Sequence, residues 1–368
     1  MAGPTPSNRL LVLCPFPVGV AAGQRLKYEQ YVDDWRAAGW DVTLSPFMDL
    51  ALWDVVYQPG HLVAKVTGTI KGVLRRWRDI FRVRRYDAVY VYIHVSPIGT
   101  TLLERLVRRL AKRLVYDIED NILDRPGAGP SINPITRMVR SPAKPRVLTV
   151  AADEVITASP FLVEPCRALN RHGRCTMIPP SVDTELFVPG RRDPARIPVI
   201  GWTGTFSSEP YLDLLRPVLQ RLAREVDYKL RVIGNFDYAL PGVDLEVVRW
   251  TRQNEVADMQ AIDIGLYPLP DDDWIRGKAG LKVIQYMAFG IPSVSSNVGT
   301  APLQVRHGET GFLADTDEDW FTMLAMLVRD PALRAQIGVA ARTEAVRLYG
   351  RHAVAGQYRA VLDRVRAR

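Results

Sequence analysis

Short, strongly apolar segments alternate with amphipathic ones along this chain, and this alternation occurs once in each half of the chain. Residues 87–95 form a nearly continuous β-branched and aromatic run, typical of a strand buried on both faces of a parallel sheet. Residues 28–35 carry apolar side chains at helical spacing, and the same alternation begins again with a strand at residue 197. Alternating strands and helices predict an α/β protein with helices on both faces of its parallel sheets. We therefore predict two doubly wound domains that face each other across a cleft at the carboxyl ends of their strands.

A proline-bearing, polar segment separates the two repeats. Residues 178–194 contain four prolines, a composition that is typical of a linker. With 368 residues, the chain is long enough for two domains of ordinary size. We predict an N-terminal domain over residues 1–180, a C-terminal domain over residues 181–345, and a last helix over residues 346–368 that can pack back on the N-terminal domain.

The composition is that of a soluble globular protein, with 47% hydrophobic and 24% charged residues. No apolar run approaches the ~18 residues of a membrane span. The three cysteines are an odd number without metal-ligand spacing, which favours a reducing compartment and hence the cytoplasm. The apolar run Leu10–Cys14 has some features of a signal peptide, but Pro15 and Pro17 interrupt it. We expect it to be the first strand.

The formal net charge of +8 is concentrated in residues 71–85. Within this segment Leu74, Trp77, Ile80 and Phe81 have helical spacing, with arginines between them. A basic amphipathic helix suits an anionic membrane surface, and it equally suits a helix whose apolar stripe packs on its own domain. Nucleic acid is a third partner that positive charge allows, but no nucleic-acid-binding motif is present, so we predict none.

Residues 274–292 read as a single buried helix, with Gly277 near its start and Gly290 as its C-terminal stop. At ~100° per residue, Lys278, Lys282 and Gln285 lie within about 60° of one another on one face. Lysines on an otherwise apolar helix are costly to bury unless an anion meets them, and a helix N-terminus also attracts anions. We predict a diphosphate as the ligand. The alternative is that the lysine stems lie along a surface helix while the ammonium groups reach water.

This segment resembles the donor-site helix of the GT-B fold glycosyltransferases of family 4. Many members carry two glutamates eight residues apart before a Met-Ala-x-Gly-x-Pro turn, where this chain has Gly277 and Gln285. A subgroup with the pattern Gly-Lys…Lys…Gln-Tyr-Met-Ala fits better. Residues 263–272 and 308–313 follow in the family's order, and residues 178–187 resemble its hinge motif. The resemblance covers nearly the whole chain, is specific mainly over residues 178–314, and implies two Rossmann-like domains.

The resemblance implies transfer of a sugar from a nucleotide diphosphate-sugar, with retention of the anomeric configuration and no required metal or other cofactor. Lys278 and Lys282 would then stabilise the leaving diphosphate, and Gln285 can hydrogen-bond a ribose hydroxyl without the charge of glutamate. Three adjacent acids, residues 271–273, cannot all face one ion, so we predict a solvated loop there and no metal site.

The loop after the strand at residue 197 is a second candidate for the donor site. Many family members have an arginine and a lysine there, whereas this chain has Gly204, Thr205 and Phe206 followed by two serines. Gly204 would let a phosphate approach the backbone, and Thr205 would donate its hydroxyl; a tight turn explains the glycine equally well. Trp250 lies where the resemblance puts the nucleotide base and can stack on it, with core packing as the alternative.

Candidate residues of the N-terminal half follow its strands. His94 ends the run 87–95, so it should reach the rim of the cleft, where the resemblance puts the donor sugar; a satisfied core histidine is the alternative. Glu119 and Asp120 follow another strand and can bind hydroxyl groups or act as a base, although Asp120 can simply cap a helix. Gly19 would allow an acceptor to approach the backbone, and Arg25 can hold an acceptor phosphate.

These expectations combine into one predicted function: a glycosyltransferase of cell-envelope polysaccharide or glycolipid biosynthesis, cytoplasmic or peripheral on the inner face of the membrane. Its acceptor is a glycan, a lipid-linked molecule or a small molecule. A transferase acting on a secondary metabolite, a nucleotide-sugar 2-epimerase and a non-catalytic sugar-nucleotide binding module are the alternatives. The predicted site residues are catalytic Lys278, Lys282, His94 and Asp120, donor-binding Gly204, Thr205, Phe206, Trp250, Gln285 and Gly277, and acceptor-binding Gly19, Arg25 and Glu119.

Overall fold

The computed structural model describes residues 8–123, 143–191, 193 and 195–367. Contacts divide the chain into two compact units. The first unit comprises residues 1–180, 277–279 and 354–368, and the second comprises residues 181–276 and 280–353. Among the described residues, no helix is both long enough and apolar enough to cross a membrane.

The first unit is built on a six-stranded parallel sheet with the strand order β2-β1-β3-β4-β5-β6. The strands are β1 (Asn8–Cys14), β2 (Trp40–Pro46), β3 (Ala88–Tyr92), β4 (Leu114–Ile118), β5 (Glu154–Thr157) and β6 (Cys175–Met177). The helices are α1 (Ala22–Arg25), η1 (Glu29–Tyr31), α2 (Val32–Ala37), α3 (Leu50–Val56), α4 (Leu62–Arg82), η2 (Val83–Arg85), α5 (Leu102–Leu110), α7 (Ala143–Ala151), η3 (Pro160–Leu162), α8 (Val163–Leu169) and α17 (Arg351–Arg366).

Both faces of this sheet are covered, because successive side chains of each strand point to opposite faces. Leu10 and Val12 of β1 pack in one core with α2 and α17, while Leu11 and Leu13 pack in the other core with α5 and α7. Helix α17 joins the first core through an apolar stripe at helical spacing: Val354, Tyr358, Val361, Leu362 and Val365.

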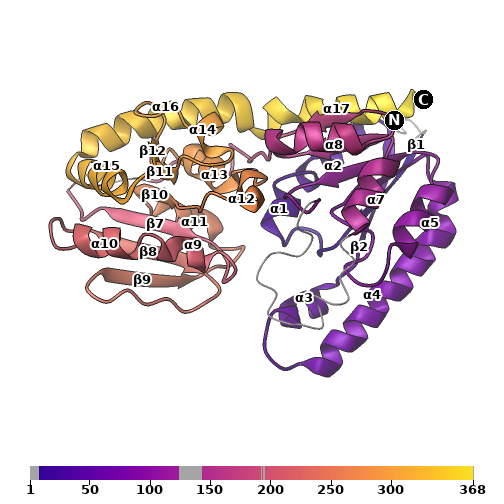
Figure 1. Ribbon diagram of the computed structural model, residues 1–368, viewed down its shortest axis with the longest axis horizontal. Coiled ribbons are helices and arrows are strands. Elements are labelled where there is room, and N and C mark those ends of the chain that lie inside the picture. The colour runs from indigo at the N-terminus through magenta and orange to yellow at the C-terminus, as the bar shows by residue number, and fades with distance from the viewer. Residues whose placement is uncertain (1–7, 124–142, 192, 194, 368) are drawn as a thin grey trace, which may run out of the picture. The chain divides into compact units, whose positions relative to one another are not determined.

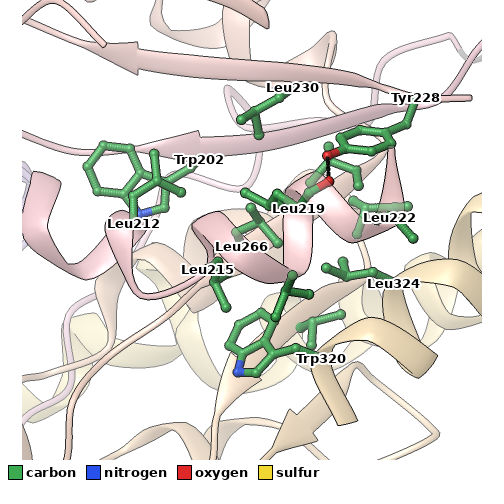
Figure 2. Close-up of a cluster of buried hydrophobic side chains, with 14 of the residues drawn as sticks. Trp202, Leu212, Leu215, Leu219, Leu222, Tyr228, Leu230, Leu266, Trp320 and Leu324 are labelled. Carbon is green, nitrogen blue, oxygen red and sulfur yellow. Dashed lines mark hydrogen bonds between the residues drawn. The ribbon is translucent and has the colours of Figure 1, made fainter. Parts of the chain in front are cut away.

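The second unit repeats the architecture, with a six-stranded parallel sheet of order β12-β11-β10-β7-β8-β9. Its strands are β7 (Val199–Thr203), β8 (Lys229–Gly234), β9 (Asp244–Arg249), β10 (Ile264–Tyr267), β11 (Ser293–Ser296) and β12 (Phe312–Ala314). Its helices are α9 (Glu209–Asp213), α10 (Arg216–Leu222), α11 (Glu255–Gln260), α12 (Asp273–Arg276), α13 (Leu281–Ala288), α14 (Ala301–Gln304), α15 (Asp317–Arg329) and α16 (Pro331–Tyr349). Figure 2 shows the core on one face of the sheet, which includes Trp202, Leu219, Leu266 and Trp320. The predicted pair of doubly wound, Rossmann-like domains is thus confirmed.

The opposite face of the second sheet is lined by small residues, which lets α13 approach closely. A Cβ on Gly265 of β10 would lie 2.6 Å from the ring of Tyr286, so the glycine makes room for this ring. The Tyr286 hydroxyl lies 3.2 Å from the carbonyl oxygen of Leu266 and 3.3 Å from that of Gly201. The fully buried tyrosine thereby fixes α13 on the sheet.

Residues 274–292 do not form the single helix that their pattern predicts. They form α12 and α13, with the non-helical residues 277–280 between them. Gly280 has a φ of +70°, which side chains with a Cβ rarely adopt, and a Cβ there would lie 2.2 Å from Gln304 Oε1. Lys278 therefore lies in the loop before α13, and it does not share a helix face with Lys282 and Gln285.

The predicted helix stop at Gly290 is confirmed. Its φ is +61°, its N–H donates to the Met287 carbonyl at 3.0 Å, and the N–H of Ile291 donates to the Tyr286 carbonyl at 2.9 Å. This pair of hydrogen bonds is the usual way in which a left-handed glycine caps a helix.

Two other predicted elements are interrupted. The strand predicted over residues 87–95 ends at Tyr92, because Ile93 has a φ of +62°. The last helix, predicted over residues 346–368, is interrupted near its start: α16 ends at Tyr349, the backbone of Gly350 is extended, and α17 begins at Arg351. There Val182 accepts a hydrogen bond from the N–H of Arg351 and donates one to the Tyr349 carbonyl, both at 2.9 Å, which a continuous helix would not allow.

Candidate functional site

Lys282 stands in the first turn of α13, at the carboxyl edge of the second sheet. Helix α13 follows β10, and its N-terminus attracts anions through its dipole and its N–H groups. The Lys282 side chain is half-buried, and its ammonium nitrogen lies 4.5 Å from the centre of the Trp202 ring. A cation over an aromatic face is attracted to it, so the indole holds the ammonium near the end of β7. Gln285, one turn further along α13, is buried.

Trp202 is the residue that sequence analysis missed. One edge of its ring lies beside Gly204, where a Cβ would come within 2.1 Å of Cη2. Phe236 packs against the ring at 5.9 Å in an edge-to-face arrangement. Because Trp202 lies in the apolar run of β7, its sequence signal is that of an ordinary core residue. Its contacts with Lys282 and Gly204 instead join two predicted donor segments.

The loop after β7 is a tight turn that uses most of its polar groups internally. Ser208 donates its hydroxyl to the Thr205 carbonyl at 3.0 Å, and the Thr205 and Ser207 hydroxyl oxygens lie 2.8 Å apart. Thr205 is exposed, and Phe206 packs partly against the core. The crowding around Gly204 is sufficient to require a glycine there. Trp250 follows β9, is half-buried, and donates its backbone N–H to the Gly234 carbonyl at 3.1 Å.

Residues 277–279 group with the first unit, and Gly277 lies tightly against Asn121. A Cβ at Gly277 would lie 2.4 Å from Asn121 Cβ, so this position requires a glycine for steric reasons. Lys278 beside it is half-buried. Asp271 is exposed and pairs with Arg276 of α12 at 2.9 Å, as predicted for a solvated loop, whereas Asp273 is exposed but begins α12.

Glu119 lies at the carboxyl end of β4 in the first unit. The Tyr92 hydroxyl donates to its carboxylate, and Gly23 of α1 leaves room for it, since a Cβ there would lie 2.6 Å from Glu119 Oε1. Burial, followed by the neighbouring charge of Asp120, raises the pKa of Glu119 to about 7, while Lys27 and Lys278 lower it. A carboxyl group with this pKa exists in both protonation states near neutral pH and can exchange a proton with a hydroxyl ligand.

Titration of Glu119 should make the stability of the first unit depend on pH. Because its folded-state pKa of about 7 exceeds the ordinary value of 4.5, the protonated form favours folding. The contribution is complete below pH 4.5 and is lost as the pH rises to about 7, by up to ~3 kcal/mol. In urea denaturation, wild type should lose stability over this range relative to Glu119→Gln. Glu164→Gln, at an exposed carboxyl, is the control, and parallel profiles for wild type and Glu119→Gln would contradict the assignment.

The turn that carries His94 is strained. Ile93 has a φ of +62°, and the N–H of His94 donates back to the Tyr92 carbonyl at 2.7 Å. Positive φ is a rare conformation for a β-branched residue, and such strain is often found at functional sites. The Tyr116 hydroxyl donates to the Ile93 carbonyl at 3.0 Å and helps to hold the turn. His94 itself is half-buried.

The loop after β1 is fixed by two side chains that sequence analysis did not single out. The N–H of Gly19 donates to Glu29 Oε2 at 2.8 Å, and Gln24 donates to the Phe16 carbonyl at 3.0 Å and to the Glu29 carboxylate. A ligand of the Gly19 amide would therefore compete with a carboxylate. Arg25 is buried in the last turn of α1. Asp120 is half-buried, and residues 124–142, where a helix capped by it would continue, lie outside the described residues.

Comparison with known proteins agrees with this geometry. Residues 197–330 match the family described as glycosyl transferases group 1. This segment contains Trp202, Gly204, Trp250, Lys282 and Gln285, so the match covers the candidate donor-binding residues of the second unit.

Similar proteins include the D-inositol 3-phosphate glycosyltransferase of Rhodococcus opacus, which is 28% identical over 251 residues, 58% of this chain and 55% of that protein. The chain thus spans about half the length of such relatives. Among solved structures, sucrose-phosphate synthase from Thermosynechococcus elongatus is similar over 98% of this chain and 99% of its own, with a TM-score of 0.72 and 18% identity. Anabaena HepE in complex with UDP and glucose is similar over 97% and 99%, with a TM-score of 0.67 and 16% identity. These structures share the GT-B fold of this chain.

Proposed function

We propose that this protein is a glycosyltransferase that moves a sugar from a nucleotide diphosphate-sugar to an acceptor, with the donor held by the second unit. The observation that carries the proposal is the placement of Lys282. Its ammonium group lies over Trp202 in the first turn of α13, within the segment that matches glycosyl transferases group 1.

Transfer breaks the bond between the anomeric carbon and the phosphate oxygen, so negative charge grows on the leaving diphosphate. Lys282 and the N-terminus of α13 would stabilise that charge. Lys278, in the loop before the helix, is the second candidate cation. Gln285 would donate or accept a hydrogen bond at the ribose, and Trp250 would stack on the base. The proposal requires neither a metal nor another cofactor, and it includes retention of the anomeric configuration.

In this proposal, the first unit binds the acceptor. Glu119 would exchange a proton with an acceptor hydroxyl, while His94 would contact the donor sugar and Arg25 an acceptor phosphate. The similar protein of Rhodococcus opacus is a D-inositol 3-phosphate glycosyltransferase, which supports a phosphate-binding role for Arg25. We further propose a lipid-linked or cell-envelope glycan acceptor and a peripheral location on the inner face of the membrane. We also propose that this chain belongs to the subgroup with the Gly-Lys…Lys…Gln pattern.

A donor panel tests the proposal. We would incubate the purified protein with UDP-, GDP-, dTDP- and ADP-sugars and measure its thermal midpoint together with slow release of the free nucleotide diphosphate. Uridine donors come first, because HepE is described in complex with UDP and glucose. We expect one donor to raise the midpoint and to be slowly hydrolysed. A changed sugar without nucleotide release would instead indicate an epimerase, and stabilisation without any turnover would indicate a binding module. No response to any donor would contradict the donor site.

A further inference from the structure

Helix α4 exposes an apolar stripe along almost its whole length. The α4 stripe consists of Val63, Val66, Ile70, Leu74, Trp77 and Phe81. These residues are spaced by three or four, and at ~100° per residue they fall within about 80° of one another. The side chains are strongly exposed: Val63 by 76%, Leu74 by 63% and Phe81 by 80%. Figure 1 shows α4 at the edge of the first unit.

The opposite face of α4 is anchored, so the stripe cannot turn inward. Gly68 and Gly72 pack closely on α3 and on the end of β2, where a Cβ would lie 2.9 Å from Leu52 and 2.7 Å from Phe47. Arg76 is fully buried and donates to the carbonyl oxygens of Cys14 at 2.7 Å and Val95 at 2.5 Å. Of the four apolar residues predicted from sequence, only Ile80 packs on its own domain. Leu74, Trp77 and Phe81 are exposed, so the alternative in which the whole stripe packs on its own domain does not hold.

The charge beside the stripe has one sign. Residues 62–85 contain eight lysines and arginines and a single acid, Asp79. That acid is buried and pairs with Arg76 at 3.0 Å, which leaves its charge compensated internally. Lys71, Arg78 and Arg82 are exposed, and at ~100° per residue they lie about 80–120° from the centre line of the stripe, on one flank.

This combination fits a lipid surface better than a partner helix. Helices that pair through such a stripe usually flank it with charges of both signs, which set partner and register. An interfacial helix instead has apolar residues on one side and cations on the other, and it lies in the plane of the membrane. From Val63 to Phe81 the stripe is about 27 Å long at ~1.5 Å per residue. Anionic headgroups would attract each neighbouring cation.

We propose that α4 lies in the plane of an anionic membrane, with the α4 stripe at the boundary of headgroups and acyl chains and with Lys71, Arg78 and Arg82 against the headgroups. The inference goes beyond the transfer reaction and does not depend on the identity of the donor. It gives the first unit a surface that would bring it to a lipid-linked acceptor.

Flotation with vesicles tests this surface. The vesicles are phosphatidylcholine alone, or phosphatidylcholine with about one-third phosphatidylglycerol. We expect the full chain to float with the anionic vesicles and the double variant Leu74→Ser/Phe81→Ser to bind them at least about tenfold more weakly, since two large apolar side chains lose their burial. Val339→Ser/Val346→Ser, at exposed apolar residues of α16, is the matched control and should bind as wild type. Lys71→Gln/Arg82→Gln should weaken binding to anionic vesicles and flatten its salt dependence.

A second readout places the helix at the membrane. Brominated phosphatidylglycerol should quench part of the tryptophan fluorescence, and Trp77→Phe should remove that part. Unchanged flotation of Leu74→Ser/Phe81→Ser would overturn the proposal, as would the failure of the full chain to bind any vesicle. A change of sedimentation coefficient caused by the same variant without vesicles would overturn it in favour of self-association. Slow donor hydrolysis is measured on the same preparations. A protein that hydrolyses the donor but does not bind vesicles would contradict the membrane proposal alone, and a protein that binds vesicles without hydrolysing any donor would contradict the proposed transferase function alone.

Discussion

Replacing Lys282 by alanine is expected to lower kcat for sugar transfer by about 10²–10³-fold, with a much smaller change in donor affinity. The reason is that its ammonium group would meet the charge that develops on the leaving diphosphate, and removing one such contact raises the barrier by ~3–4 kcal/mol. Steady-state kinetics with the donor identified by the panel, together with calorimetric binding of the same donor, would separate the two effects. A pure binding module would lose affinity and have no kcat to lose.

Two further variants serve as a control for Lys282→Ala and as a test of the contact between Lys282 and Trp202. Lys229→Ala removes a lysine at the beginning of β8, at the opposite edge of the same sheet, and should leave kcat unchanged. Trp202→Leu keeps Lys282 but removes the aromatic face below its ammonium group, so we expect a smaller loss of kcat than with Lys282→Ala. An unchanged kcat in Lys282→Ala would contradict its role and leave Lys278 as the cation to examine.

The fold could be predicted because its signals are local. The buried run of β1, the apolar spacing of α2 and the glycine stop after α13 each lie within a few residues of the element that they define. The breaks could not be predicted in the same way. Gly280 is held in its left-handed conformation beside Gln304 of α14, and Gly350 is extended because it lies beside Val182. In both cases the decisive neighbour is distant in sequence, so periodicity alone favoured a longer helix.

In the candidate site, too, local sequence signals predicted some features, and contacts between distant segments determine the others. Position at strand ends sufficed to select Glu119 and His94, and a lysine on an otherwise apolar helix sufficed to select Lys282. Their surroundings depend on contacts between segments: Trp202 lies below Lys282, and Tyr92 bonds Glu119. Tyrosine and tryptophan in buried strands look like core residues in any sequence, and only the fold shows which of them face a polar partner. The α4 stripe was predicted only in part. The burial of Ile80 and the exposure of Val63, Val66 and Ile70 depend on how α4 is anchored, which the sequence does not show.

Lys27→Met is expected to destabilise the first unit by about 3–5 kcal/mol, the largest stability effect among these predictions. The Lys27 ammonium group is fully buried, pairs with Asp117 and donates to the Ile118 carbonyl at 3.3 Å. Tyr90 donates its hydroxyl to the same carboxylate. Without the lysine, Asp117 would keep a buried charge with only one hydrogen-bond donor. Urea denaturation of the variant measures the loss.

The double variant Lys27→Met/Asp117→Asn tests whether the uncompensated charge causes that loss. Asparagine removes the charge and still accepts a hydrogen bond from Tyr90, so we expect most of the stability to return. Arg36→Met, at an exposed pair with Asp33, should change stability by less than about 1 kcal/mol. Burial already raises the pKa of Asp117 and Lys27 lowers it, so the single variant should raise that pKa further and lose less stability at acidic pH. Equal losses for the single and double variants would instead attribute the effect to packing of the lysine stem.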